Sequence, residues 1–92
     1  MPSIIHEDGG PAIAILDCAV TYALRRAGGT LEANRVTFWV PASSKGITTG
    51  QFYTLLLDDG TTYRILLQDA RALLDEPDRL QCRSVVDDDS NG

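Results

Sequence analysis

Hydrophobic and polar positions alternate along several stretches of the chain, and a period of two residues is typical of β-strands. Residues 35–42, RVTFWVPA, place Val36, Phe38 and Val40 on one side of an extended backbone. Pro41 has no N–H to donate to a neighbouring strand, so this strand should end there or lie at a sheet edge.

A β-hairpin is predicted immediately after this strand. Residues 51–57, QFYTLLL, and residues 61–67, TTYRILL, flank the turn sequence DDG at 58–60. Asp-Gly accepts the positive φ that tight hairpin turns require. Residues 80–86, LQCRSVV, alternate again and predict the last strand. Three side chains of the returning hairpin strand should face the core: Tyr63, Ile65 and Leu67.

Residues 11–29 fit two structures. A helix over residues 11–27 would begin at Pro11 and end before Gly28, positions that suit these residue types. Alternation from Cys18 onward, with the aromatic and β-branched content of AVTY, indicates a strand over residues 18–26 instead. A short helical stretch over 11–17 followed by that strand satisfies both patterns, and the pattern alone does not decide.

The predicted fold is mainly β, a small antiparallel barrel or sandwich of four to five strands with short helical segments. The alternative is an α+β fold with one helix, 11–27, packed on a four-stranded antiparallel sheet. Residues 68–78 should form a short helix or a wide connection, because Pro77 cannot lie inside a long helix. Residues 1–92 make one domain, with a flexible N-terminal arm at 1–10 and a disordered acidic tail at 87–92.

The formal net charge of −5 argues against a nucleic-acid partner bound through its phosphates, which needs a basic face, and against an anionic membrane surface. No apolar stretch reaches the ~18 residues of a membrane span. The first residues lack the basic and apolar regions of a signal peptide. These features predict cytoplasmic synthesis, and two cysteines, Cys18 and Cys82, that stay reduced.

The sequence offers no recognisable catalytic or metal-binding motif. His6 is the single histidine and lies in the predicted arm, so neither a Ser/His nor a Cys/His pair is expected. The carboxylates fall in predicted turns, where solvated charges are usual. Lys45 precedes Gly46, which is the wrong order for a phosphate-binding loop. We therefore predict no catalytic residue, no metal and no cofactor.

Exposed residues of the predicted loops and strands are better candidates for protein contacts. Arg25, Arg26 and Arg35 form a basic cluster if they flank one connection. Trp39 faces away from Phe38 on the same strand, and tryptophan often anchors an interface. The loop PASSKGITTG at 41–50 adds two more candidate contact residues, Lys45 and Ile47. The predicted partner-binding residues are Arg25, Arg26, Arg35, Trp39, Lys45 and Ile47.

Two of these segments resemble a known family. The stretch AVTYALRRAGGTL followed by RVTFWVPA, and later ITTGQFYTLLLDDGTTYRILL, is similar to the small head–tail joining (neck) proteins of tailed bacteriophages. In that family an opening VTYRR…G strand precedes a GD…DG..Y.V hairpin. Val20-Thr21-Tyr22 echoes the first motif, and Asp59-Gly60 with Tyr63 echoes the second, within roughly residues 18–86.

The resemblance implies a virion structural protein and no enzyme. It implies a β-barrel subunit, synthesised in a bacterial host, that docks into a ring between the portal side of a capsid and the tail. Portal-side or tail proteins and copies of the chain would be its partners. The alternative is a small acidic binding or inhibitory protein of the phage anti-defence type, which blocks a host protein and which a helix at 11–27 would suit better.

Overall fold

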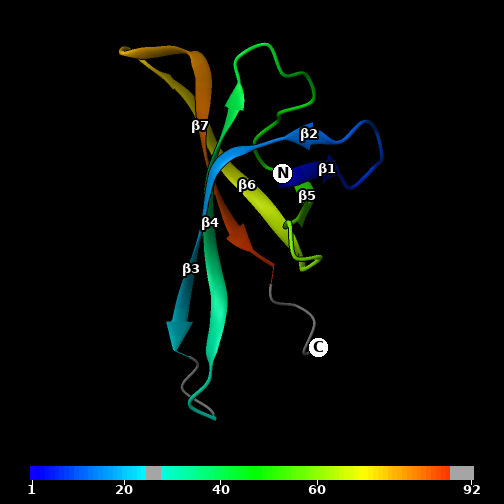
Figure 1. The fold of residues 1–92 in the computed structure, drawn as a ribbon, viewed down its shortest axis with the longest axis vertical. Coiled ribbons are helices and arrows are strands. Elements are labelled where there is room, and N and C mark those ends of the chain that lie inside the picture. The colour runs from blue at the N-terminus through cyan, green and yellow to red at the C-terminus, as the bar shows by residue number, and fades with distance from the viewer. Residues whose placement is uncertain (25–27, 88–92) are drawn as a thin grey trace.

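The computed structural model describes residues 1–24 and 28–87, and in this part of the chain every regular element is a strand. Seven strands form one antiparallel sheet in the order β2-β1-β5-β6-β7-β4-β3 (Figure 1). Their bounds are β1 (Ser3–His6), β2 (Ile13–Ala14), β3 (Leu16–Leu24), β4 (Leu31–Pro41), β5 (Phe52–Leu56), β6 (Thr62–Leu73) and β7 (Glu76–Val86).

The sheet curls into a half-barrel because one segment of the chain belongs to both of its ends. β2 and β3 are the two outermost strands, yet only Ile15 separates them in the sequence. The Ile15 N–H donates a hydrogen bond to the Pro2 carbonyl at 3.0 Å, and the Ile15 side chain is buried. The sheet must therefore bend until its two ends meet at this residue.

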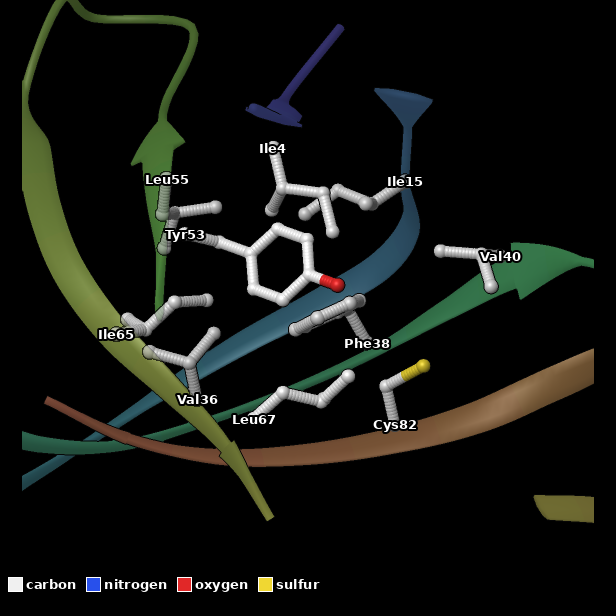
Figure 2. Close-up of a cluster of buried hydrophobic side chains, with 10 residues drawn as sticks. All are labelled: Ile4, Ile15, Val36, Phe38, Val40, Tyr53, Leu55, Ile65, Leu67 and Cys82. Atoms are coloured by element: carbon white, nitrogen blue, oxygen red, sulfur yellow. The ribbon is translucent and has the colours of Figure 1, made fainter. Parts of the chain in front are cut away.

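The concave face of the half-barrel holds the hydrophobic core. Figure 2 shows the core side chains gathered around the ring of Tyr53. Phe38 and Tyr53 are the largest of them, and Ser84, a buried polar residue, donates its hydroxyl to the Val36 carbonyl at 2.9 Å. The buried cluster consists of Ile4, Ile15, Val36, Phe38, Val40, Tyr53, Leu55, Ile65, Leu67 and Cys82.

The mainly β class and the four strands with clear alternation are confirmed. The predicted strand at 35–42 lies in β4 up to Pro41, with its predicted apolar face buried, and residues 80–86 lie in β7. The predicted hairpin is β5–β6, in which Ile65 and Leu67 are fully buried and Tyr63 packs at the margin of the core.

The predicted helical content is wrong for the residues described. The segment expected as a helix over 11–27 contains β2 and β3 instead. Cys18 and Val20 pack against the core from alternate positions of β3, which only an extended backbone allows. Residues 68–78 are also not helical, because β6 continues to Leu73 and β7 starts at Glu76.

Pro77 is accommodated in this second hairpin by an irregularity in the pairing. Ala72 pairs with Leu80, whereas the next residue of β6, Leu73, pairs with Glu76. The residues between Glu76 and Leu80 therefore bulge out of the β6 ladder, and a bulge is where a strand tolerates proline. The strand count rises above the predicted four to five because the N-terminal residues add β1 and β2, whereas the tight hairpin only lengthens β6 and β7.

Part of the predicted N-terminal arm belongs to the sheet. β1 pairs with β2 on one side and with β5 on the other, and Ile4 is fully buried. The apolar pair Ile4-Ile5 therefore acts as a short strand rather than as a loose segment. Of the predicted acidic tail, only Asp87 is described; its N–H donates to the Arg64 carbonyl at 2.7 Å. Residues 88–92 lie outside the described residues.

The β5–β6 turn explains why glycine stands at position 60. The Gly60 N–H donates to the Leu57 carbonyl and the Leu57 N–H to the Thr61 carbonyl, which leaves a three-residue loop. Gly60 adopts φ of 91°, the left-handed conformation that closes such loops. The sequence therefore indicated the hairpin and its glycine correctly, and the predicted turn residues 58–60 form the loop.

Substituting Gly60 with valine is expected to lower the free energy of unfolding by about 1–3 kcal/mol, because a β-branched residue resists positive φ. No atom lies within 4 Å of the Cβ position, so backbone strain alone should produce the loss. Urea melts provide the measurement. Gly60→Asn, which tolerates this conformation better, is the control, and a valine variant as stable as the wild type would contradict the turn geometry.

Candidate protein-interaction surface

The distal half of the β3–β4 hairpin extends beyond the rest of the sheet (Figure 1), and its apolar side chains are exposed. Tyr22 pairs with Ala33, and Leu24 pairs with Leu31. Tyr22 is 53% exposed, Leu24 67% and Leu31 68%. Tyr22 and Leu24 continue the alternation of Cys18 and Val20, so they lie on the concave face of the sheet. The core face thus continues past the residues that fill the core.

A tyrosine of this extension interacts with a tyrosine of the far wall of the half-barrel. Hydrogen bonding with Tyr22, followed by burial, raises the pKa of Tyr63. Tyr63 lies on β6, and β7 and β4 separate β6 from β3 in the sheet. The interaction therefore reaches across the concave side, while more than half of the Tyr22 surface remains open to solvent.

β3 also leaves one of its hydrogen-bonding edges open. Within residues 1–24 and 28–87, its pairing partner is β4 and no second strand lies against it. Residues 18–24, CAVTYAL, contain no charged residue, no proline and no glycine. Most natural edge strands carry such residues to prevent pairing with other chains. An uncharged open edge beside an apolar face is suited to receive a strand from another protein.

Ionic contacts fix the start of β3. Asp17 has φ of 51°, and the pairing register with β4 shifts at this point. Its carboxylate accepts a hydrogen bond from Arg79 at 3.0 Å. Arg79 also donates to Glu76, and both carboxylates raise the pKa of this arginine, Glu76 more strongly. β3 therefore leaves the core in a defined direction.

Trp39 is covered by the chain itself. The Arg79 guanidinium lies 4.0 Å from the centre of its ring, a cation–π contact, and Trp39 is half-buried. Arg35, on the same strand, is exposed and pairs with Thr21 and Val85. Arg25 and Arg26 lie outside the described residues, so the structure does not bring the predicted basic cluster together.

The loop after β4 contains the last two predicted contact residues, and Tyr53 holds it in place. The buried Tyr53 hydroxyl donates to the Gly46 carbonyl at 2.5 Å and accepts from the Thr48 N–H at 2.9 Å. Between these anchors, Ile47 packs against the core, and Lys45, directly before Gly46, is exposed. Lys45 is thus presented to solvent from a fixed loop, while Ile47 serves mainly as a core contact.

Replacing Tyr53 with phenylalanine is expected to lower the free energy of unfolding by about 1–2 kcal/mol, because two hydrogen bonds to the loop are lost. Hydrogen exchange at the Thr48 amide should accelerate more than at amides of β7. The matched control is Tyr63→Phe, which removes a hydroxyl at the margin of the core that anchors no loop and should cost less. Equal losses in the two variants would contradict the anchoring role of Tyr53.

An ionic cluster on the convex face, which sequence reasoning missed, joins both ends of the described chain. Arg64 donates from Nε to Glu7 at 2.9 Å and from a terminal nitrogen to Asp87. Its guanidinium lies 3.8 Å from the centre of the Phe52 ring. These carboxylates raise the pKa of Arg64, Glu7 more strongly. The residues are far apart in sequence, so no local pattern could indicate the cluster.

The groups with potential chemistry are dispersed. Burial, assisted by the charge of Asp69, raises the pKa of Cys82 to about 11, so at neutral pH its sulfur is a protonated thiol rather than a nucleophile. His6 contacts the Tyr53 ring edge-on at 5.1 Å between centroids. Among the described residues, no group of three His, Cys, Asp or Glu side chains is placed to hold a metal ion.

The same part of the chain contains no helix long and apolar enough to cross a membrane. Comparison with protein-family models gave no match, and neither did comparison with curated protein sequences or with solved structures. The candidate site is therefore defined by its geometry alone: the open edge of β3 and the apolar residues Tyr22, Leu24 and Leu31 at the end of the hairpin.

Proposed function

We propose that this protein is a non-enzymatic structural subunit that acts through protein–protein contacts, of the type that joins head and tail in a tailed bacteriophage. The observation that carries the proposal is the uncharged open edge of β3 beside the exposed Tyr22, Leu24 and Leu31. A monomer gains nothing from extending an apolar face past its core, whereas a subunit of an assembly can bury that face against a neighbour.

The extended structure of Leu16–Leu24 supports this proposal, because residues 20–22 carry the first half of the resemblance to neck proteins. The segment is a strand that leaves the core, as a docking element requires. A portal-side or tail protein would add a strand to β3 and cover Leu24 and Leu31. The exposed Lys45, held in its loop by Tyr53, would supply a second contact.

Under this proposal the gene belongs to a tailed phage, and disrupting it there tests the function directly. Loss of the protein is expected to give filled heads and free tails that fail to join, which electron microscopy would reveal. Normal joined particles would overturn the proposal. They would favour instead an acidic binding protein, whose affinity for its target should fall as salt rises.

Complementation with point variants tests the surface itself. Leu31→Asp should fail to restore joining, because a carboxylate would be placed in the buried contact. Leu74→Asp is the matched control, since Leu74 is a fully exposed leucine at the turn of the other long hairpin. Both variants should fold, because neither side chain is in the core. Equal complementation by both would exclude the β3–β4 hairpin as the joining surface.

A further inference from the structure

We propose that two copies of this chain pair through β3, antiparallel to each other, about a two-fold axis at Thr21. The inference does not depend on head–tail joining, since it concerns the state of the free protein before any other partner is present. It joins two half-barrels into one continuous sheet, with both concave faces on the same side.

The length and chemistry of the open edge define where the second copy lies. The uncharged stretch of β3 runs over residues 18–24, and Thr21 is its midpoint. The irregularity at Asp17 ends the stretch available for pairing on one side, because a left-handed residue interrupts regular pairing. Each chain carries a formal net charge of −5, so two copies repel least where the contact itself contains no charge.

Pairing about Thr21 makes the strand complementary to itself on both faces. On the concave face, Val20 of one copy lies opposite Tyr22 of the second copy, and Cys18 opposite Leu24. Aromatic and β-branched residues form favourable cross-strand pairs. On the convex face, Ala19 meets Ala23 and Thr21 meets Thr21, so small side chains oppose each other without a clash.

The distribution of exposure along β3 fits a second copy of the chain in the free protein. Cys18 and Val20, near the body, pack at the margin of the core, whereas Tyr22 and Leu24, further out, are exposed. Antiparallel self-pairing places the exposed outer half of each β3 beside the inner half of the other. Each copy thereby supplies the apolar cover that the other lacks.

The first test is the molar mass in solution, measured by light scattering after size-exclusion chromatography. The wild type is expected to be a dimer, and Thr21→Glu a monomer, because two like charges would face each other across the axis. Thr37→Glu is the matched control. Thr21 and Thr37 are both exposed, and each pairs with an arginine, Arg35 and Arg83 respectively, but β4 is already flanked by two strands. The control should remain dimeric.

The second test fixes the register by cross-linking in a Cys18→Ala background. Directly opposite Cβ atoms lie about 4.5–5.5 Å apart, so Thr21→Cys should form an intermolecular disulfide under mild oxidation. Ala23→Cys should not, because the two copies of position 23 would be about 13 Å apart along the strands.

Three outcomes would overturn the inference: a monomeric wild type at high micromolar concentration, a dimeric Thr21→Glu variant, or equal cross-linking at positions 21 and 23. A ring of more than two copies would also overturn it, because a two-fold contact closes on itself. None of these outcomes bears on head–tail joining, which the gene disruption tests separately.

Discussion

Replacing Phe38 with alanine is expected to lower the free energy of unfolding by about 3–5 kcal/mol. Phe38 is 1% exposed and is one of the two largest fully buried side chains. It lies in β4, between β3 and β7, and belongs to the core cluster, so the cavity would open inside the curled sheet. A domain of this size has a total stability of about 5–15 kcal/mol, and the variant would lose a large part of it.

Urea or thermal melts followed by circular dichroism provide the measurement. Phe52→Ala is the control, because Phe52 is half-buried on the convex face, beneath the Arg64 guanidinium. It should cost clearly less than Phe38→Ala. Similar losses for the two phenylalanines would mean that the sheet does not curl toward the face that holds Phe38.

Replacing Ile4 with alanine is expected to lower the free energy of unfolding by about 2–5 kcal/mol. Such a loss would be unusual so close to a chain end, where residues are commonly disordered. Here Ile4 is fully buried and pairs with Ile13 on one side and Leu55 on the other. The smaller side chain would leave a cavity where the two ends of the sheet meet.

Ile5→Ala is the matched control, because the Ile5 side chain points to the opposite face of the sheet from Ile4 and is only half-buried. It should lose less stability than Ile4→Ala. A wild-type melting curve for Ile4→Ala would show that the first residues do not pack on the core, as the predicted flexible arm would require.

The sequence by itself determined the strands that have one face on the core and the other face toward solvent. Val36, Phe38 and Val40 alternate with polar neighbours because one face of β4 packs on the core. Asp59 and Gly60 marked the hairpin because a left-handed residue must close its loop. These signals depend on a residue and its immediate neighbours, so they can be recognised without the fold.

The tertiary structure decided what depends on distant partners. Residues 11–27 satisfied a helix and a strand equally well, and pairing with β1 and β4 selected the strand for the described part. Ile4 became a core residue because the sheet curls back at Ile15 and encloses it.

The candidate site, too, was determined partly by the sequence and partly by the tertiary structure. Trp39 suggested an interface anchor, but Arg79, far along the chain, covers it. Tyr22, Leu24 and Leu31 gave no local sign that they would be exposed, because the core-facing pattern simply continues past the end of the core. The uncharged run at 18–24 was visible in the sequence, but only the strand order places it at an open edge. Edge and exposure are properties of how strands meet, and residue type alone does not determine them.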